Sequence, residues 1–209
     1  MRTIEEAIKV IEALLLVSDE PLNQSQLVDL LADADEDHSR LAELVPRALF
    51  AIEQQCLNRA YQLIEVKSGF RFQVRADMNP WVKKLFGQRT RQYSRAVLET
   101  LALIAYKQPI TRGEIEKVRG VAVHTQIIRN LMERGWIREL GTREVPGRPL
   151  LYGTTERFLD YFNLSSLSDL PPLKELEDLT SPDSFQSEDI PVVLSPSDTI
   201  KRSDSVSDE

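Results

Sequence analysis

Residues 145–162 read VPGRPLLYGTTERFLDYF, and this stretch decides how the second half of the chain folds. Two prolines, Pro146 and Pro149, fix their φ angles on either side of a Gly-Arg pair, which predicts a stiff, tight loop. A short apolar run typical of a strand follows, and the pattern then becomes helical. The stretch therefore predicts a loop tip, a return strand and a closing helix that is capped by Thr154 or Thr155.

Three helices are predicted ahead of this loop. Residues 94–107 place their apolar side chains on one helical face, and the following proline ends that helix. Thr111 and Glu114 have the spacing of a capping box for a second helix, which Gly120 ends. Residues 124–135 form the third helix, and a strand leads from it into the loop. The residues of this helix that we expect to point inward are Ile127, Ile128, Leu131 and Met132.

The first half of the chain repeats this order. Residues 3–17 form an amphipathic helix rather than a signal peptide, because charged residues interrupt the apolar run and no small-residue cleavage site follows. Asn23 is expected to cap a short second helix, and a third helix covers about residues 41–58. Residues 61–75 alternate with a period of two around a Ser-Gly turn, which predicts a β-hairpin. Residues 78–87 form a short closing helix.

Three helices followed by a two-stranded hairpin make a winged helix, a variant of the helix-turn-helix. The sequence therefore predicts a mainly α fold with small β-hairpins, arranged as two tandem winged-helix domains. We expect the N-terminal domain at residues 1–90 and the C-terminal domain at residues 91–173, with a junction near residues 87–93. Each domain is long enough to bury a core of its own.

The charge of the chain lies in its last segment. Residues 174–209 hold 3 basic and 10 acidic residues and are rich in Ser, Asp and Pro. This composition cannot bury enough apolar area to offset chain entropy, so we predict a disordered acidic tail. The rest of the chain is neutral, but residues 91–162 hold 12 basic and 8 acidic residues. That excess favours an acidic partner, either nucleic acid or a peptide.

The chain offers few residues for catalysis or metal binding. Its histidines, His38 and His124, lie in polar segments away from the single cysteine, Cys56, so we expect no metal site. Cys56 lies at helical spacing from apolar residues and is expected to be a buried structural thiol in a reducing cytoplasm. The glycines of GRPLLYG are too far apart for a nucleotide-binding loop, and that loop's lysine is absent. We therefore predict no catalytic residue, no cofactor, no small-molecule substrate and no membrane segment, and we do not expect an enzyme.

Two kinds of partner suit a winged helix. DNA would meet the third helix of the second domain, where Gln126, Arg129 and Asn130 can reach base edges. The neutral body and the acidic tail disfavour two tandem DNA-reading domains. A protein partner would instead use an edge of the wing or an apolar groove, and Tyr106 and Tyr152 are amphipathic residues suited to such an interface. The fold by itself does not decide between them.

Two of these motifs also carry a resemblance to a known family. The segments IAYKQPITRGEIEKVRGV (104–121) and PGRPLLYGTT (146–155) resemble the bacterial segregation and condensation protein B (ScpB) family, and the similarity covers about residues 4–173. The resemblance implies a non-catalytic adaptor that forms homodimers through its N-terminal domain. It also implies binding to the kleisin ScpA, which bridges an SMC ATPase, and a role in chromosome condensation and segregation in the cytoplasm, on the nucleoid. Any contact with DNA would be indirect or non-specific, and a DNA-binding transcriptional regulator remains the alternative function.

The resemblance also implies a set of candidate kleisin-binding residues in the second domain. They are Tyr106, Lys107, Gln108, Arg112, Arg119, Arg148, Pro149 and Tyr152. Gly147 is expected to serve the turn rather than a partner. Arg148 has an alternative inside the domain, an ion pair with Glu144 or Glu139. The acidic tail lies outside the motifs and inherits no role from the resemblance.

Overall fold

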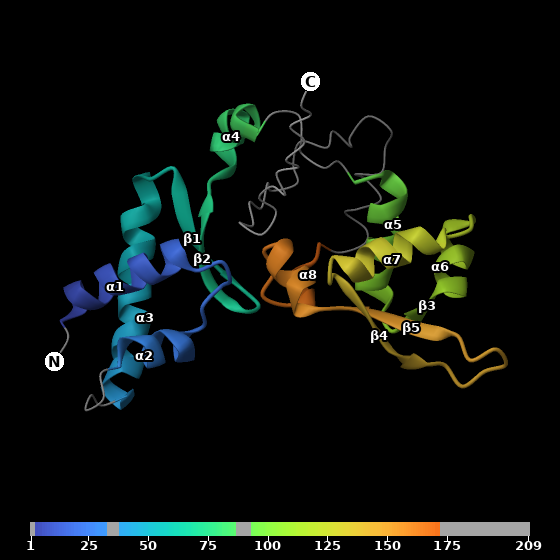
Figure 1. Ribbon diagram of the computed structural model, residues 1–209, viewed down its shortest axis with the longest axis horizontal. Helices are drawn as coiled ribbons and strands as arrows, with labels where there is room; N and C mark the ends of the chain where they lie inside the picture. The colour runs from blue at the N-terminus through green and yellow to red at the C-terminus, as the bar shows by residue number, and fades with distance from the viewer. Residues whose placement is uncertain (1–2, 33–37, 87–92, 172–209) are drawn as a thin grey trace, which may run out of the picture.

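The structure, a computed structural model, describes residues 3–32, 38–86 and 93–171 (Figure 1). The predicted acidic tail and, apart from Tyr93, the predicted domain junction lie outside these ranges. Within them, no helix is both long enough and apolar enough to cross a membrane.

The described chain is mainly helical and has two small antiparallel sheets, as predicted. Its N-terminal half contains α1 (Ile4–Val17), α2 (Gln24–Leu31), α3 (His38–Gln55), η1 (Cys56–Asn58), β1 (Tyr61–Val66), β2 (Gly69–Val74), η2 (Ala76–Met78) and α4 (Asn79–Phe86). Its C-terminal half contains α5 (Arg95–Lys107), β3 (Ile110–Thr111), α6 (Arg112–Arg119), α7 (Thr125–Glu133), β4 (Ile137–Thr142), β5 (Leu150–Thr154), α8 (Glu156–Tyr161) and η3 (Leu167–Asp169). The third helix thus begins about three residues earlier than predicted, and its last turn is a 3₁₀ turn.

Local sequence signals fix several helix ends. The side chains of Asn23 and Thr111 accept hydrogen bonds from the third residue of α2 and α6, and both capping boxes are complete. Gly120 ends α6 in the left-handed conformation that favours glycine, with φ +70°. Thr155 rather than Thr154 caps α8, since its hydroxyl accepts the hydrogen bond from the Phe158 N–H.

The N-terminal core lies between α1, α2, α3 and the β1–β2 hairpin. Its fully buried side chains include Ile11, Leu27, Leu31, Leu41, Val45 and Ile52. The hairpin is tied to the α1–α2 connection by two backbone hydrogen bonds between Leu22 and Phe70, at 3.0 and 2.9 Å. Gly69 has φ +141°, and an added Cβ would lie 2.4 Å from the Leu22 carbonyl carbon and oxygen. The hairpin can approach α2 this closely only because residue 69 is glycine.

The C-terminal core is separate from the first one. It gathers buried side chains of α5, α6, α7, α8 and the sheet, including Ile104, Ile115, Leu131 and Trp136. The sheet has the strand order β3-β5-β4, so β4 is an edge strand, and its register shifts between Glu139 and Gly141. One expectation for α7 was wrong. Met132 does not point into the core but is 37% exposed, because β4 and β5 leave an open groove beside it.

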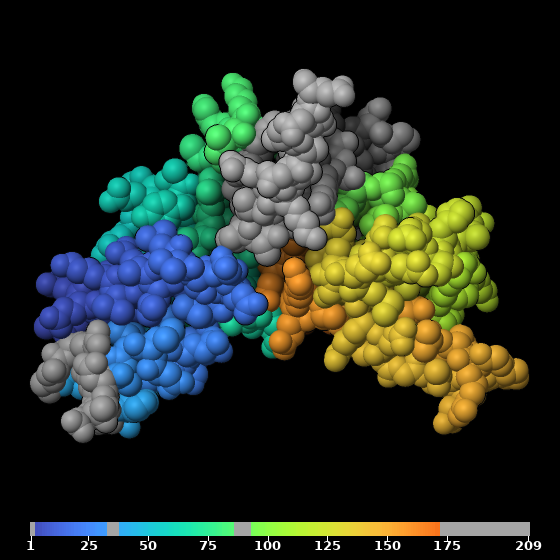
Figure 2. Space-filling view, viewed as in Figure 1, coloured from blue at the N-terminus to red at the C-terminus, as the bar shows by residue number. Residues whose placement is uncertain are grey.

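The two halves lie side by side as two lobes, with α8 between them (Figures 1 and 2). The tip of the β1–β2 hairpin reaches α8 and the turn that follows it, where the Lys67 N–H donates to the Leu164 carbonyl at 3.1 Å. This contact brings together segments nearly one hundred residues apart in the sequence.

Candidate partner-binding site

A groove runs along the C-terminal half between α7 and the wing formed by β4 and β5. Its volume is about 520 Å³. The residues that line it are Thr125, Ile128, Arg129, Met132, Glu133, Glu139 and Tyr152. The helical spacing of the α7 residues places them on one face, and strand pairing sets Glu139 directly opposite Tyr152. The groove is therefore built from the third helix and the wing, where the sequence placed a possible partner.

The groove has an apolar floor and a charged rim. Ile128 and Tyr152 are buried and form part of the C-terminal core, while Met132 offers a flexible apolar surface. Arg129, Glu133 and Glu139 add charge of both signs at the edge. Burial raises the pKa of Tyr152, and the nearby Glu139 raises it further. The Tyr152 hydroxyl therefore keeps its proton to a higher pH than the hydroxyl of an exposed tyrosine.

Gln108 holds the domain together from inside. Its side-chain oxygen accepts a hydrogen bond from the Thr154 N–H at 2.7 Å, and its amide nitrogen donates to the Thr154 hydroxyl at 2.9 Å. These bonds fasten the end of α5 to β5, the strand that carries Tyr152. The structure thus gives Gln108 a positioning role behind the groove.

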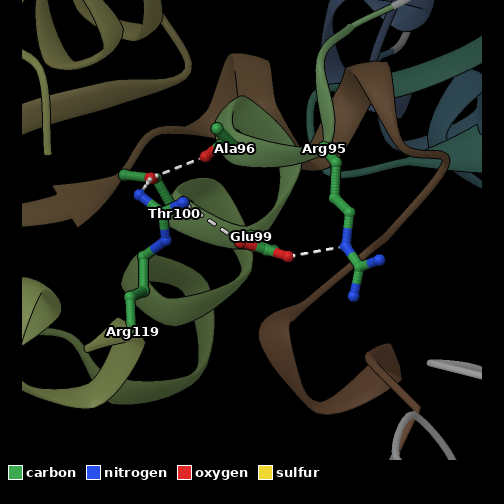
Figure 3. Close-up of polar contacts among 5 residues, drawn as sticks. All are labelled: Arg95, Ala96, Glu99, Thr100 and Arg119. Atoms are coloured by element: carbon green, nitrogen blue, oxygen red, sulfur yellow. Dashed lines mark hydrogen bonds and ion pairs between the residues drawn. The ribbon is translucent and has the colours of Figure 1, made fainter. Parts of the chain in front are cut away.

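Arg119 also lies inside the domain. Its guanidinium contacts Glu99 at 3.1 Å and the Thr100 hydroxyl at 3.3 Å, and its side chain is only 9% exposed (Figure 3). Thr100 donates in turn to the Ala96 carbonyl at 2.7 Å, and Arg95 pairs with Glu99 from the solvent side at 2.8 Å. Burial by itself would raise the pKa of Glu99, but the hydrogen bonds from Arg95 and Arg119 outweigh it and hold that pKa below its ordinary value. This network ties α6 to α5.

Arg112 lies between the interior and the groove. Its Nε contacts Glu116 at 3.0 Å, and its Nη1 donates to the hydroxyl of Thr125, which lines the groove, at 3.1 Å. Glu116 also accepts the Val123 N–H at 2.9 Å, and this bond is the main reason that its pKa lies below its ordinary value. Arg112 therefore holds the start of α7 in place at one end of the groove.

The wing tip is more open. Arg148 is exposed, has φ +38° and forms no ion pair among the described residues, so the suggested pairing with Glu144 or Glu139 is not present. The ion pair of the wing instead joins Arg143 to Glu114 at 2.5 Å. Pro149 accepts the Arg143 N–H at 2.9 Å and closes the loop. Arg148 is thus the predicted wing residue that is available to a partner.

Tyr106 and Lys107 end α5 on a different surface. The Tyr106 hydroxyl donates to the Pro171 carbonyl at 2.5 Å, so it contacts the last described residue of the chain. Lys107 is exposed. Neither residue lines the groove, so the eight predicted residues do not form one continuous site.

Two of the three residues predicted to read DNA bases, Gln126 and Asn130, are already hydrogen-bonded to each other. The Gln126 amide donates to the Asn130 side-chain oxygen at 2.7 Å, which uses groups that base recognition would need. Arg129 lies beside Glu133 in the lining of the groove. The surface of α7 therefore suits a peptide with both apolar and charged side chains better than a polyanion such as DNA.

Five groove residues are not among the site residues predicted from the sequence: Thr125, Ile128, Met132, Glu133 and Glu139. The helical spacing of the α7 residues was the available signal, because it places them on one face of the helix. In the described ranges, no group of three or more His, Cys, Asp or Glu side chains is placed to hold a metal ion. Cys56 is buried, as predicted, and burial raises the pKa of its thiol.

Comparison with known proteins gives the family. Residues 9–173 match the family model of the segregation and condensation complex subunit ScpB. The segregation and condensation protein B homolog of Coxiella burnetii is 49% identical over 170 residues, which cover 81% of this chain and 80% of the relative. The segregation and condensation protein B of Syntrophotalea carbinolica is 43% identical over 171 residues, 82% of this chain and 84% of the relative.

Two solved structures are also similar. A crystal structure of ScpB from Mycobacterium tuberculosis is 34% identical and covers 77% of this chain and 96% of its own, with a TM-score of 0.35. A crystal structure of a dimer of an ScpB N-terminal domain complexed with an ScpA peptide is 25% identical and covers 45% of this chain and 99% of its own, with a TM-score of 0.34. On the family model and the two sequence relatives, this chain belongs to the ScpB family of segregation and condensation complex subunits.

Proposed function

We propose that this protein is a non-catalytic, dimeric adaptor that binds the kleisin ScpA with the groove between α7 and the wing. Through ScpA it meets the SMC ATPase, in the cytoplasm on the nucleoid. The proposal keeps two tandem winged-helix domains, residues 1–90 for dimerisation and residues 91–173 for the kleisin. The observation that carries it is the groove itself, because its apolar floor and mixed-charge rim suit a peptide.

Two features of the groove favour a kleisin segment as its occupant. Met132 offers exposed apolar area that an amphipathic segment can cover, and the buried Ile128 and Tyr152 lie beneath it. Glu133 and Glu139 offer partners for the basic side chains of such a segment. The edge strand β4 borders the groove and leaves backbone groups open for an added strand. This surface does not need to rearrange when a kleisin segment binds, because Gln108 and Arg112 already hold β5 and α7 in place.

The N-terminal half supplies the surface for the proposed dimer. Large apolar side chains are unusually exposed there, with Val17 at 83%, Leu85 at 80% and Leu16 at 68%. None of residues 79–85 of α4 is buried, and Trp81 and Leu85 give this part of the helix an apolar side. Exposed apolar area of this extent is typical of a surface that another chain covers. We therefore assign the dimer contact to the ends of α1 and to α4.

Binding of the cognate ScpA to variants of the groove tests the kleisin proposal. Met132→Asp places a charge on the apolar part of the groove at an exposed position, so the fold is expected to survive. We expect the affinity for ScpA, measured by isothermal titration calorimetry, to fall by about tenfold or more. Tyr152→Phe removes only the hydroxyl and is expected to weaken binding less.

Leu167→Asp is the matched control, because Leu167 is 39% exposed and does not line the groove. It should bind ScpA like the wild type. If Met132→Asp also binds like the wild type while Val17→Asp abolishes binding, the kleisin is held by the N-terminal half and the proposed site is wrong.

The dimer is tested by size-exclusion chromatography with light scattering. The wild type should elute as a dimer of about twice 23.9 kDa. Replacing Val17 and Leu85 together by glutamate should give a folded monomer, because two charges would then be buried without partners. A wild-type protein that is monomeric at micromolar concentration would contradict the proposal.

A further inference from the structure

The contact between the two halves is built from side chains far apart in the sequence. The Ser68 N–H donates to one carboxylate oxygen of Asp160 at 2.9 Å, and the Ser68 hydroxyl donates to the other at 2.5 Å. Arg71 donates from one nitrogen to the Asp160 carbonyl at 2.9 Å and to the Asn163 side-chain oxygen at 2.8 Å. With the backbone bond from Lys67 to Leu164, the hairpin is joined to α8 and to the turn after it by five hydrogen bonds.

The turn after α8 is shaped for this contact. Asn163 has φ +58°, a left-handed conformation that asparagine tolerates better than most residues. Its own N–H donates to the Asp160 carbonyl at 3.3 Å, so that carbonyl accepts from both Asn163 and Arg71. The left-handed turn thus directs the Asn163 side chain to the guanidinium.

Strand β2, which carries Arg71, has buried polar side-chain atoms without hydrogen-bond partners among the described residues. Arg71 is partly buried, and its Nε has no hydrogen-bond partner among the described residues. The side-chain oxygen of Gln73, two residues along the same strand, is buried without a partner as well. A desolvated guanidinium with an unused donor gains hydration when the contact opens, which offsets part of the bonds that are lost. The geometry therefore favours a contact that can open and close.

Helix α8 also connects the contact to the groove. Only Thr155 separates it from Thr154, the last residue of β5. The Thr155 N–H donates to the Trp136 carbonyl at 3.1 Å, and the Thr155 hydroxyl donates to the Gly135 carbonyl. These bonds fasten α8 to the segment that joins α7 to β4, so α8 moves with both walls of the groove. Whatever holds α8 to the hairpin also sets the direction of the groove relative to the N-terminal half.

We propose that Ser68, Arg71, Asp160 and Asn163 form a reversible latch that holds the two halves of the chain at one fixed angle. When it is closed, the groove has a defined direction relative to α1 and α4. When it opens, the side-chain bonds between the β1–β2 hairpin and the end of α8 no longer fix that direction. The latch lies within one chain and does not depend on the identity of the partner.

Distance measurements by double electron–electron resonance test the latch. Spin labels at Glu53→Cys on α3 and Lys117→Cys on α6 report on the two halves in a Cys56→Ala background, since Glu53 and Lys117 are exposed. Dilution with an excess of unlabelled protein suppresses distances between protomers. We expect one narrow distance distribution for the otherwise unchanged chain.

Removing the latch should broaden that distribution. Arg71→Ala removes the bonds to the Asp160 carbonyl and to Asn163, whereas Asp160→Ala removes the two bonds from Ser68. Each variant is expected to broaden the distribution at least twofold, and the double variant should broaden it at least as much as either one. Arg71→Lys keeps one donor and should lie between. Arg75→Ala is the control, since Arg75 directly follows β2 and its side chain contacts neither Asp160 nor Asn163 in the described structure.

Unchanged circular dichroism and tryptophan fluorescence will show that each variant is folded. A distribution that is already broad before any latch residue is changed, or one that stays narrow in Arg71→Ala, would overturn the proposal. The measurement uses the protein without ScpA, so such a result leaves the proposed kleisin adaptor untouched.

Discussion

Replacing Gly69 by alanine tests how the hairpin is joined to the α1–α2 connection. The added Cβ would lie 2.4 Å from the Leu22 carbonyl carbon and 2.5 Å from the Asn23 nitrogen, and these backbone atoms cannot rotate away. The φ of +141° adds strain of about 1–3 kcal/mol for a residue with a side chain. Displacing Leu22 also lengthens its two hydrogen bonds with Phe70, each worth about 1 kcal/mol.

The free energy of unfolding of Gly69→Ala should therefore fall by about 4 kcal/mol. Urea unfolding followed by circular dichroism measures this loss as a shift of the midpoint. Gly113→Ala is the matched control, because Gly113 lies in α6, has nothing within 4 Å of the added Cβ and has no left-handed φ. It should leave stability unchanged or raise it by about 0.5–1 kcal/mol. A Gly69→Ala protein with the midpoint of the wild type would refute the reasoning.

Three further predictions concern ionisable groups. Arg119→Met should lower the free energy of unfolding by about 1–3 kcal/mol, because it leaves Thr100 and Glu99 without that partner. Arg95→Met should lower it by less than about 0.5 kcal/mol, since Arg95 is 71% exposed. Equal urea midpoints for the two variants would contradict this prediction. The pKa values of Glu99, Glu114 and Glu116 lie below the ordinary 4.5, so below that pH the unfolded chain binds more protons than the folded chain. The free energy of unfolding should therefore fall as the pH drops from 4.5 through the folded pKa values. Urea midpoints at about pH 6 and pH 3 measure this loss, which should be smaller in Glu114→Gln. Burial raises the pKa of the Cys56 thiol, so at pH 8 it should react with a disulfide reagent at least about ten times more slowly in the folded protein than in the unfolded chain. Equal rates would show that Cys56 is open to solvent.

Local patterns in the sequence predicted most elements of the fold. The alternation in residues 61–75 gave the hairpin, and Asn23 and Thr111 marked helix starts through contacts only three residues away. Such signals survive because they depend on neighbours in the chain and not on tertiary packing.

Side chains that act over long distances were not predictable in the same way. Arg119 and Gln108 stand in the family motifs, but only the packing of α5 against α6 and β5 shows that they face inward. Met132 shares a helical face with buried residues, yet the wing leaves it uncovered. The bonds from Ser68 to Asp160 span 92 residues, and no periodic pattern connects them.

The edge strand β4 has a consequence for how the protein behaves at high concentration. A flat, exposed edge invites strands of other copies to stack on it and is a common start of aggregation. In β4 the register shift at Leu140 inserts an extra residue, which bends the strand and increases its twist, and Arg138 and Glu139 place charges beside the bend. The bent, charged edge therefore resists the repeated, in-register stacking that would remove the protein from solution.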